Sequence, residues 1–105
     1  MRDKEKADSS RPDYRVFETR RFSGDLDRIP HNYRERIGKK LRLFVYPQLR
    51  SQPHFGSNIK KLKNWAPDTW RYRIGSWRFF YEISEGEKIV FMTAAEHRSE
   101  IYREK

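Results

Sequence analysis

The 105-residue sequence predicts an α+β domain in which a small antiparallel β-sheet is packed by an N-terminal pair of helices. Apolar residues between Ile29 and Val45 recur at spacings of three and four, which is the period of an amphipathic helix. In the C-terminal third they alternate with other residues instead, which is the period of a strand. Aromatic residues, 15% of the chain, are expected to supply most of the core, and a chain of this length has room for one core only.

The N-terminal region predicts a tail, a strand and the start of a helix. Residues 1–13 combine charges of both signs with Ser and Pro and have no large apolar side chain after Met1. We therefore expect a flexible tail there and a single domain over residues 14–105. Residues 14–19 alternate around Val16 and fit a first strand. A helix is expected to begin soon afterwards, with Ser23 or Asp25 as its N-cap.

A longer helix is expected to follow Pro30, because proline suits the first turn of a helix and not its interior. The apolar stripe on this helix consists of Ile29, Tyr33, Ile37, Leu41, Phe44 and Val45. Pro47 is expected to end the helix. Residues 48–58 then read as a loop, and residues 59–64 as a short basic element anchored to the core.

Three alternating runs near the C-terminus predict an antiparallel meander over residues 70–74, 77–83 and 88–95. Gly75-Ser76 fits a two-residue hairpin loop of type II′, in which glycine comes first. That loop fixes the register, and the expected opposite pairs on the apolar face are Ile74 with Trp77, Tyr72 with Phe79, and Trp70 with Tyr81. The next turn is expected to have three residues, with Gly86 in the left-handed conformation.

The same register places arginines opposite each other on the second face of the hairpin. Arg73 is expected to face Arg78, and Arg71 to face Phe80. Like charges directly opposite each other destabilise a strand pair, so a purely structural sheet gains nothing from them. A bound anion would relieve the repulsion. We therefore interpret this face as directed at a polyanion, the alternative being the solvent side of two amphipathic strands.

The formal net charge of +9 is concentrated in the middle of the chain. Residues 36–78 contain eleven Lys or Arg and a single carboxylate, Asp68, whereas the rest of the chain is close to neutral. A localised positive field attracts nucleic acid and speeds association, although a well-solvated surface can have the same composition.

Composition also excludes several classes of protein. The chain has no cysteine, which rules out disulfides and thiolate metal sites. Its longest largely apolar segment, residues 89–95, is far shorter than the roughly 20 residues that span a bilayer. The N-terminus also lacks a hydrophobic signal region. We therefore expect a cytoplasmic protein.

Common catalytic motifs are missing from the sequence. It has no phosphate-binding glycine loop, no paired-histidine metal motif and no Ser-His-Asp arrangement, so neither a metal nor another cofactor is expected. Metal-free cleavage of RNA needs a base for the 2′-hydroxyl, cations at the phosphate and an acid for the leaving oxygen. Arginine pairs with two phosphate oxygens at once, and the candidates for that role are Arg71, Arg73, Arg78 and Arg98.

Two further residues are candidates for proton transfer. Imidazole is the side chain best matched to proton transfer near neutral pH, which makes His97 a candidate. Tyr102 is another, provided that neighbouring arginines favour its ionised form. Both residues also have a structural interpretation, His97 as a turn residue and Tyr102 as a packing residue. Phe80, the lone aromatic residue on the arginine-bearing face, either stacks on a base, lies under a binding partner or is covered by a helix of its own chain.

Three segments together resemble the RelE/ParE superfamily of bacterial toxin–antitoxin toxins, namely Lys60-Lys-Leu-Lys, Trp70-Arg-Tyr-Arg-Ile-Gly-Ser-Trp-Arg-Phe-Phe-Tyr-Glu-Ile and His97-Arg-Ser-Glu-Ile-Tyr. The resemblance covers residues 14–102 and is strongest in the hairpin with its glycine turn and in the terminal His-Arg-x-x-x-Tyr. It implies a small antiparallel sheet packed by a helical pair, in agreement with the order of elements derived above.

In the ribonuclease branch of this superfamily, the resemblance implies metal-free, ribosome-dependent cleavage of mRNA by attack of the 2′-hydroxyl. It also implies inhibited translation and control by a cognate antitoxin. The implied cleavage site consists of Arg71, Arg73, Arg78, His97 or Arg98, and Tyr102. The implied RNA contacts are Lys60, Lys61, Lys63 and Phe80, and ribosomal RNA is a further expected partner. Glu96 stands where some members carry a cation, and arginines replace lysines on the second strand of the family fold, so the identity of the general base stays open.

Two other functions remain open on the sequence. A ParE-like toxin shares the fold but binds DNA gyrase and cuts no RNA. A non-catalytic member would bind only RNA or its antitoxin. Part of the positive charge could also serve to bind an acidic segment of the antitoxin.

Overall fold

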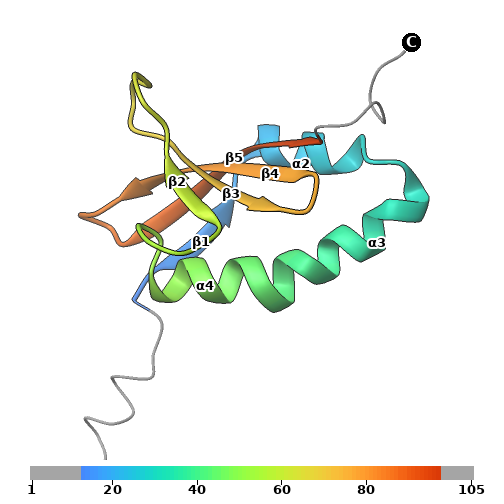
Figure 1. Ribbon diagram of the computed structural model, residues 1–105, viewed down its shortest axis with the longest axis horizontal. Coiled ribbons are helices and arrows are strands. Elements are labelled where there is room, and N and C mark those ends of the chain that lie inside the picture. The colour runs from blue at the N-terminus through green and yellow to red at the C-terminus, as the bar shows by residue number, and fades with distance from the viewer. Residues whose placement is uncertain (1–12, 98–105) are drawn as a thin grey trace, which may run out of the picture.

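The computed structural model describes residues 13–97, which form a five-stranded sheet with a long helix lying along one of its faces (Figure 1). The order of strands across the sheet is β1-β5-β4-β3-β2. The strands are β1 (Arg15–Glu18), β2 (Ile59–Lys61), β3 (Trp70–Ile74), β4 (Trp77–Ser84) and β5 (Ile89–His97). The helices are α2 (Arg20–Asp27), α3 (His31–Lys40), the π-helical turn η1 (Leu41–Val45) and α4 (Tyr46–Ser51).

The predicted α+β class is confirmed, with its N-terminal strand, helical pair and C-terminal meander, and the sheet differs from the prediction in two respects. β1 pairs with β5 in parallel, so the sheet is mixed. The basic element at residues 59–64 contributes β2, which pairs antiparallel with β3 at the edge of the sheet. Parallel pairing needs a long crossover connection between the two strands. Here the helices α2 to α4 form the first part of the connection between β1 and β5. The alternation within a four-residue strand carries no information about which strand will be its partner. The predicted tail over residues 1–13 lies almost wholly outside the described residues.

The predicted register of the first hairpin is confirmed at every pair, including Arg73 opposite Arg78. Gly75 has a φ of +61°, and Ser76 is not among the described residues with positive φ. This combination is a type II′ loop, because type I′ would need positive φ at both residues. The expected three-residue turn at Gly86 is wrong. Ser84 pairs with Ile89, which leaves four residues in the turn, and Lys88 takes the left-handed conformation with a φ of 57°.

The N-cap of α2 is Thr19, and not Ser23 or Asp25 as predicted. The Thr19 hydroxyl accepts a hydrogen bond from the Phe22 amide at 3.3 Å and donates one to the Met92 carbonyl at 2.7 Å. Asp25 is instead buried inside the helix, where its carboxylate accepts the Ala95 amide at 2.9 Å. Beyond the end of β1, the Asp25 side chain thus supplies a hydrogen-bond acceptor to the part of the β5 edge that β1 does not cover.

The helix beneath the sheet continues past Pro47, so the predicted end at this residue is wrong, as is the predicted start of the loop at residue 48. In η1 the Tyr46 amide donates to the Leu41 carbonyl, five residues earlier. A π-turn inserts one extra residue into the helix and changes the phase of its faces. Pro47 then lies at the first turn of α4, where a missing amide costs little. The same change of phase leaves Phe44 56% exposed, although the sequence predicted it for the apolar stripe.

The core lies between this helix and the aromatic face of the sheet. Its fully buried large side chains include Phe22, Ile37, Leu49, Phe79, Tyr81 and Met92. The Tyr81 hydroxyl donates to the Pro53 carbonyl at 2.7 Å, which ties the loop after α4 to the sheet. Among the described residues, no helix is long and apolar enough to cross a membrane.

Candidate nucleic-acid interface

The sheet face that lies opposite the core carries the predicted arginines, and its register brings them into two rows. In one row, Lys60 faces Arg71, which faces Phe80. In the other, Arg73 faces Arg78, which faces Glu96. We call this surface the arginine face and define it by Lys60, Arg71, Arg73, Arg78, Phe80 and Glu96. The structure thus collects three of the predicted catalytic arginines and one predicted RNA-binding lysine on one surface.

Two arginines of this face have an N–H group that makes no hydrogen bond within the described part of the chain. Arg73 is exposed, whereas Arg71 and Arg78 are half-buried. The Nε atoms of Arg71 and Arg78 are buried and have no hydrogen-bond acceptor in the part of the chain that the structure describes. These two atoms have almost no exposed surface, so a bound phosphate would pair with the remaining N–H groups of the half-buried guanidinium groups.

Glu96 provides the face with one anion of its own. Its carboxylate lies 3.3 Å from Nη2 of Arg78. The repulsion between Arg73 and Arg78, which the sequence analysis assigned to a bound anion for relief, is therefore partly balanced within the chain. Because both partners of the ion pair are at least one-third exposed, its contribution to stability is small.

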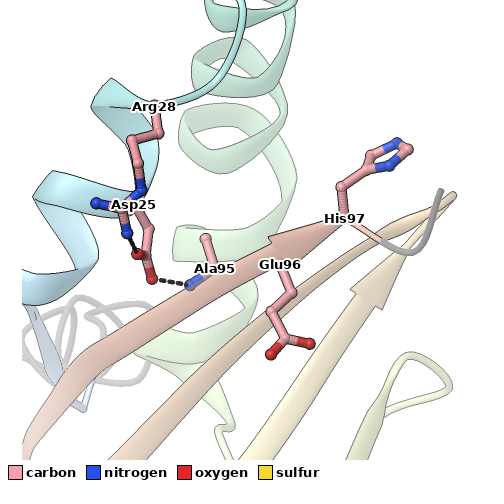
Figure 2. Close-up of a pocket in the computed structure, with 5 residues that line it drawn as sticks. All are labelled: Asp25, Arg28, Ala95, Glu96 and His97. Carbon is pink, nitrogen blue, oxygen red and sulfur yellow. Dashed lines mark hydrogen bonds and ion pairs between the residues drawn. The ribbon is translucent and has the colours of Figure 1, made fainter. Parts of the chain in front are cut away.

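His97 does not join the arginine face. It pairs with Trp77, whose side chain belongs to the core side, and the two rings meet edge to face with centroids 4.5 Å apart. Figure 2 shows the side chains of His97 and Glu96 leaving β5 on opposite sides. His97 instead borders a pocket of about 360 Å³ together with Arg28 and the buried Asp25.

A β-bulge explains this placement of His97. Tyr81 pairs with Met92 but Phe80 pairs with Ala94, so β5 contains one extra residue at this point. An extra residue exchanges the two faces for everything beyond it. Without the bulge, the alternation would have placed His97 on the arginine face, whereas the sequence analysis put His97 beyond the end of the third strand. Arg98 and Tyr102, the other predicted residues of the C-terminal segment, lie outside the described residues.

The predicted RNA-binding residues are distributed over three environments. Lys60 lies on the arginine face. Lys61 points to the other side, where its Nζ lies 3.4 Å from the Asp68 carboxylate and 5.4 Å from the centroid of the Trp70 ring. Lys63 is exposed in the loop that joins β2 to β3.

Phe80 is covered by a ring from a loop of its own chain, and not by a helix, as one interpretation of the sequence had it. The rings of Trp65 and Phe80 are stacked, with centroids 6.1 Å apart and an interplanar angle of 13°. Trp65 remains 52% exposed. Sequence analysis did not single out Trp65, because a tryptophan in a loop gives no periodic signal.

A second polar cluster lies at the tip of the β4–β5 hairpin. The Tyr14 hydroxyl donates to Glu85 at 2.8 Å, and Nε2 of His54 lies 2.5 Å from the other oxygen of the same carboxylate. These two hydrogen bonds lower the pKa of Glu85 below its ordinary value of 4.5. Burial, followed by the hydrogen bond to Glu85, raises the pKa of Tyr14 to about 12.

Two core tyrosines also have raised pKa values, and burial is the main cause for both. Tyr46 is further stabilised in its neutral form by its hydrogen bond to Glu18, and Tyr81 lies beside Tyr72. A tyrosine needs a lowered pKa to act as a general base near neutral pH, so Tyr14, Tyr46 and Tyr81 are unsuited to that role. Within residues 13–97 there is also no group of three or more His, Cys, Asp or Glu side chains that could hold a metal ion.

Comparison with protein families gives one match over most of the chain. Residues 10–102 match the model of the ParE toxin of the type II toxin–antitoxin system parDE. A search of curated proteins finds no significant match.

Several solved structures share the fold. The toxin–antitoxin complex RelBE2 from Mycobacterium tuberculosis gives a TM-score of 0.64 at 22% identity, covering 83% of this chain and 99% of that one. The archaeal RelE–RelB complex from Pyrococcus horikoshii gives 0.61 at 20% identity, covering 83% and 97%. The isolated E. coli RelE toxin gives 0.58 at 24% identity, covering 85% and 90%. At these identities the likeness shows a shared fold.

Proposed function

Since this chain belongs to the ParE toxin family of type II toxin–antitoxin systems, within the RelE/ParE superfamily, we propose that it is a toxin that cleaves mRNA on the ribosome. The observation that carries the proposal is the arginine face, where Arg71, Arg73 and Arg78 lie together with Lys60. The proposal places the protein in the cytoplasm, where translated mRNA is found.

The chemistry assigned to this face is stabilisation of charge on the phosphate. Attack of the 2′-hydroxyl on the adjacent phosphorus displaces the 5′-oxygen and leaves a 2′,3′-cyclic phosphate. Negative charge grows on the non-bridging oxygens during this step, and guanidinium groups held beforehand by the sheet stabilise it. The accessibility of the three arginines supports this role, because Arg73 is exposed and neither Arg71 nor Arg78 is fully buried.

Proton transfer in this proposal belongs to the C-terminal segment. Because His97 lies on the core side of the sheet, the arginine face needs its base and acid from residues beyond β5. Arg98 and Tyr102 are the residues that the family resemblance assigns there, and we keep them as the candidates.

A cognate antitoxin is the proposed protein partner. Structures with the same fold include RelE–RelB complexes from Pyrococcus horikoshii and E. coli. The positive face would attract an acidic antitoxin segment as well as RNA. We infer that such a segment covers Arg71, Arg73 and Arg78 and competes with the substrate for them.

Binding of DNA gyrase without RNA cleavage is the second candidate function. It is favoured by the family model, which describes a ParE toxin, and by the position of His97 away from the arginines. The Arg78–Glu96 ion pair also neutralises part of the proposed cleavage site.

One set of variants separates the two candidates. We expect induction of the wild-type toxin to produce new mRNA 5′ ends within translated regions, as mapped by primer extension. Arg71→Ala combined with Arg73→Ala should abolish these ends. Arg36→Ala combined with Arg42→Ala removes the same charge from the exposed side of the long helix and should leave the ends unchanged. Inhibition of purified gyrase supercoiling with intact mRNA would instead establish the second function.

A further inference from the structure

We propose that the exposed indole of Trp65 is a stacking site for an unpaired base of the RNA, beside the phosphate-binding arginines. This inference rests on the proposed function, because it concerns how the RNA is held at the same face. It moves to Trp65 the base-stacking role that the sequence analysis gave to Phe80. Phe80, the predicted stacking residue, becomes the support, and Trp65 becomes the residue that meets the base.

The first support for this role is the exposure of the ring. Tryptophan is highly buried on average in folded proteins, yet Trp65 is 52% exposed. Its one described ring contact is the stacked contact with Phe80, at an interplanar angle of 13°. Parallel stacking covers one side of an indole. The half that stays in solvent offers a flat aromatic surface to a ligand.

The loop that carries Trp65 is tied down at both of its ends. The Leu62 amide donates to the Thr69 carbonyl at 2.9 Å, and Lys61 pairs with Asp68 at 3.4 Å. Next to Trp65, Asn64 takes the left-handed conformation with a φ of 63°. A ring held by its loop and by Phe80 loses little conformational freedom when a base binds.

The chemistry around the ring is that of a single-stranded nucleic-acid site. Phe80 lies directly opposite Arg71, which lies directly opposite Lys60, so Trp65 stacks on a ring that shares one row of the sheet with two cations. Lys63 and Asn64 border a pocket of about 360 Å³ beside Trp65. Proteins that bind single strands combine cations that follow the backbone with aromatic rings on which bases stack. Double-stranded RNA keeps its bases stacked inside and would not use this ring.

Binding to matched RNAs tests the proposal. The probes are a short fluorescently labelled single-stranded RNA and an abasic RNA of the same length, which keeps the charge and loses the bases. We expect wild-type toxin to bind the base-containing RNA roughly tenfold more tightly than the abasic one, as one stacked base would give. Trp65→Ala should remove this preference and leave the affinity for abasic RNA unchanged.

Two further Trp65 variants and one charge control separate the loss of the aromatic surface from other effects of the substitution. Trp65→Leu retains apolar contact with Phe80 and lacks an aromatic surface, so it should behave like Trp65→Ala even if the smaller side chain loosens the loop. Trp65→Phe should retain most of the preference. Arg71→Ala is the matched control for charge, and it should weaken the binding of both RNAs to a similar extent.

The possible failures point to different errors. If Trp65→Ala keeps the wild-type preference, the base stacks elsewhere and the inference is overturned, while the proposed function stands. Equal loss of both affinities also overturns it, because Trp65 would then only support the basic surface. If Trp65→Ala weakens the complex with the antitoxin and leaves RNA preference intact, the ring is a protein anchor. If wild-type toxin binds neither RNA, the inference is overturned, while the proposed function is decided separately by the mapped mRNA 5′ ends.

Discussion

The same strand register stabilises one face of the sheet and destabilises the other. On the core side, opposite residues such as Tyr72 and Phe79 are both buried and pack against the helices. On the arginine face, the same strands place Arg73 opposite Arg78, an arrangement that lowers stability. One alternation therefore serves both purposes, because residues that stabilise the fold and residues that we propose to bind RNA occupy neighbouring positions in β3 and β4. Substitutions only one residue apart are therefore expected to differ in their effects on stability and on RNA binding.

The largest effect is expected where the core side is broken. Phe79 is completely buried, and Phe79→Ala should lower the free energy of unfolding by about 3–5 kcal/mol, since it removes a large side chain and leaves a cavity. Phe80→Ala changes the same residue type at the next position on the opposite face and should cost clearly less. Urea unfolding followed by circular dichroism measures both. Equal costs would contradict the division between the faces.

A smaller effect is expected at Asp25, the buried carboxylate beside the core side of β5. Asp25→Ala leaves the Ala95 amide without its acceptor and should lower the free energy of unfolding by about 1–3 kcal/mol. Asp25→Asn, which keeps an oxygen at this position, should cost less. Hydrogen exchange at the Ala95 amide is the direct measurement, and unchanged protection in Asp25→Ala would show that another group replaces the carboxylate.

Arg73→Glu should sharpen the comparison by separating stability from binding. It converts the repulsion with Arg78 into an attraction, which should raise the free energy of unfolding by about 0.2–1 kcal/mol. The same change should weaken RNA binding, because a cation of the arginine face is lost and an anion gained. Arg42→Glu, on the exposed side of the long helix, is the matched control and should do neither. Thermal melts and RNA titrations at one salt concentration give both readouts. A variant that is less stable and binds RNA normally would contradict the assignment.

The smallest effect is expected at the border of the two faces, in the cluster around Glu85. Its pKa is lowered in the folded protein, so the stability that it contributes is present above the ordinary carboxyl pKa of 4.5 and is lost as the pH falls through the lowered value. Glu85→Gln should therefore flatten the acid limb of a plot of melting temperature against pH. Glu87→Gln in the same turn, where the carboxylate contacts Ser84, is the control. Identical acid limbs for Glu85→Gln and wild type would show that the cluster has no part in acid stability.

The sequence was most informative where one local feature decides the geometry. Gly75-Ser76 admits a two-residue loop, and this loop alone places Arg73 opposite Arg78. Prediction failed where non-local packing decides. The π-turn at η1 lets the helix pass Pro47, the bulge between Phe80 and Tyr81 exchanges the faces of β5, and the partner of β1 is chosen by the whole fold. Half of the candidate site could therefore be predicted from the hairpin. The placement of His97 and of Trp65 depended on irregularities that carry no periodic signal.

The parallel pairing of β1 with β5 has a consequence for the order in which the sheet assembles. The Thr19 hydroxyl, just beyond β1, donates to the carbonyl of Met92 in β5, which lies 73 residues later in the sequence. The first strand can therefore pair only after the last strand has been synthesised. Contacts between such distant parts of a chain form slowly, because the intervening segment must be ordered first. β5 is also the strand that brings Glu96 to Arg78. During synthesis the sheet can close only after nearly all of the described chain has emerged. The topology therefore delays closure of the sheet between β1 and β5, and with it the contact of Glu96 with Arg78, until β5 has been synthesised.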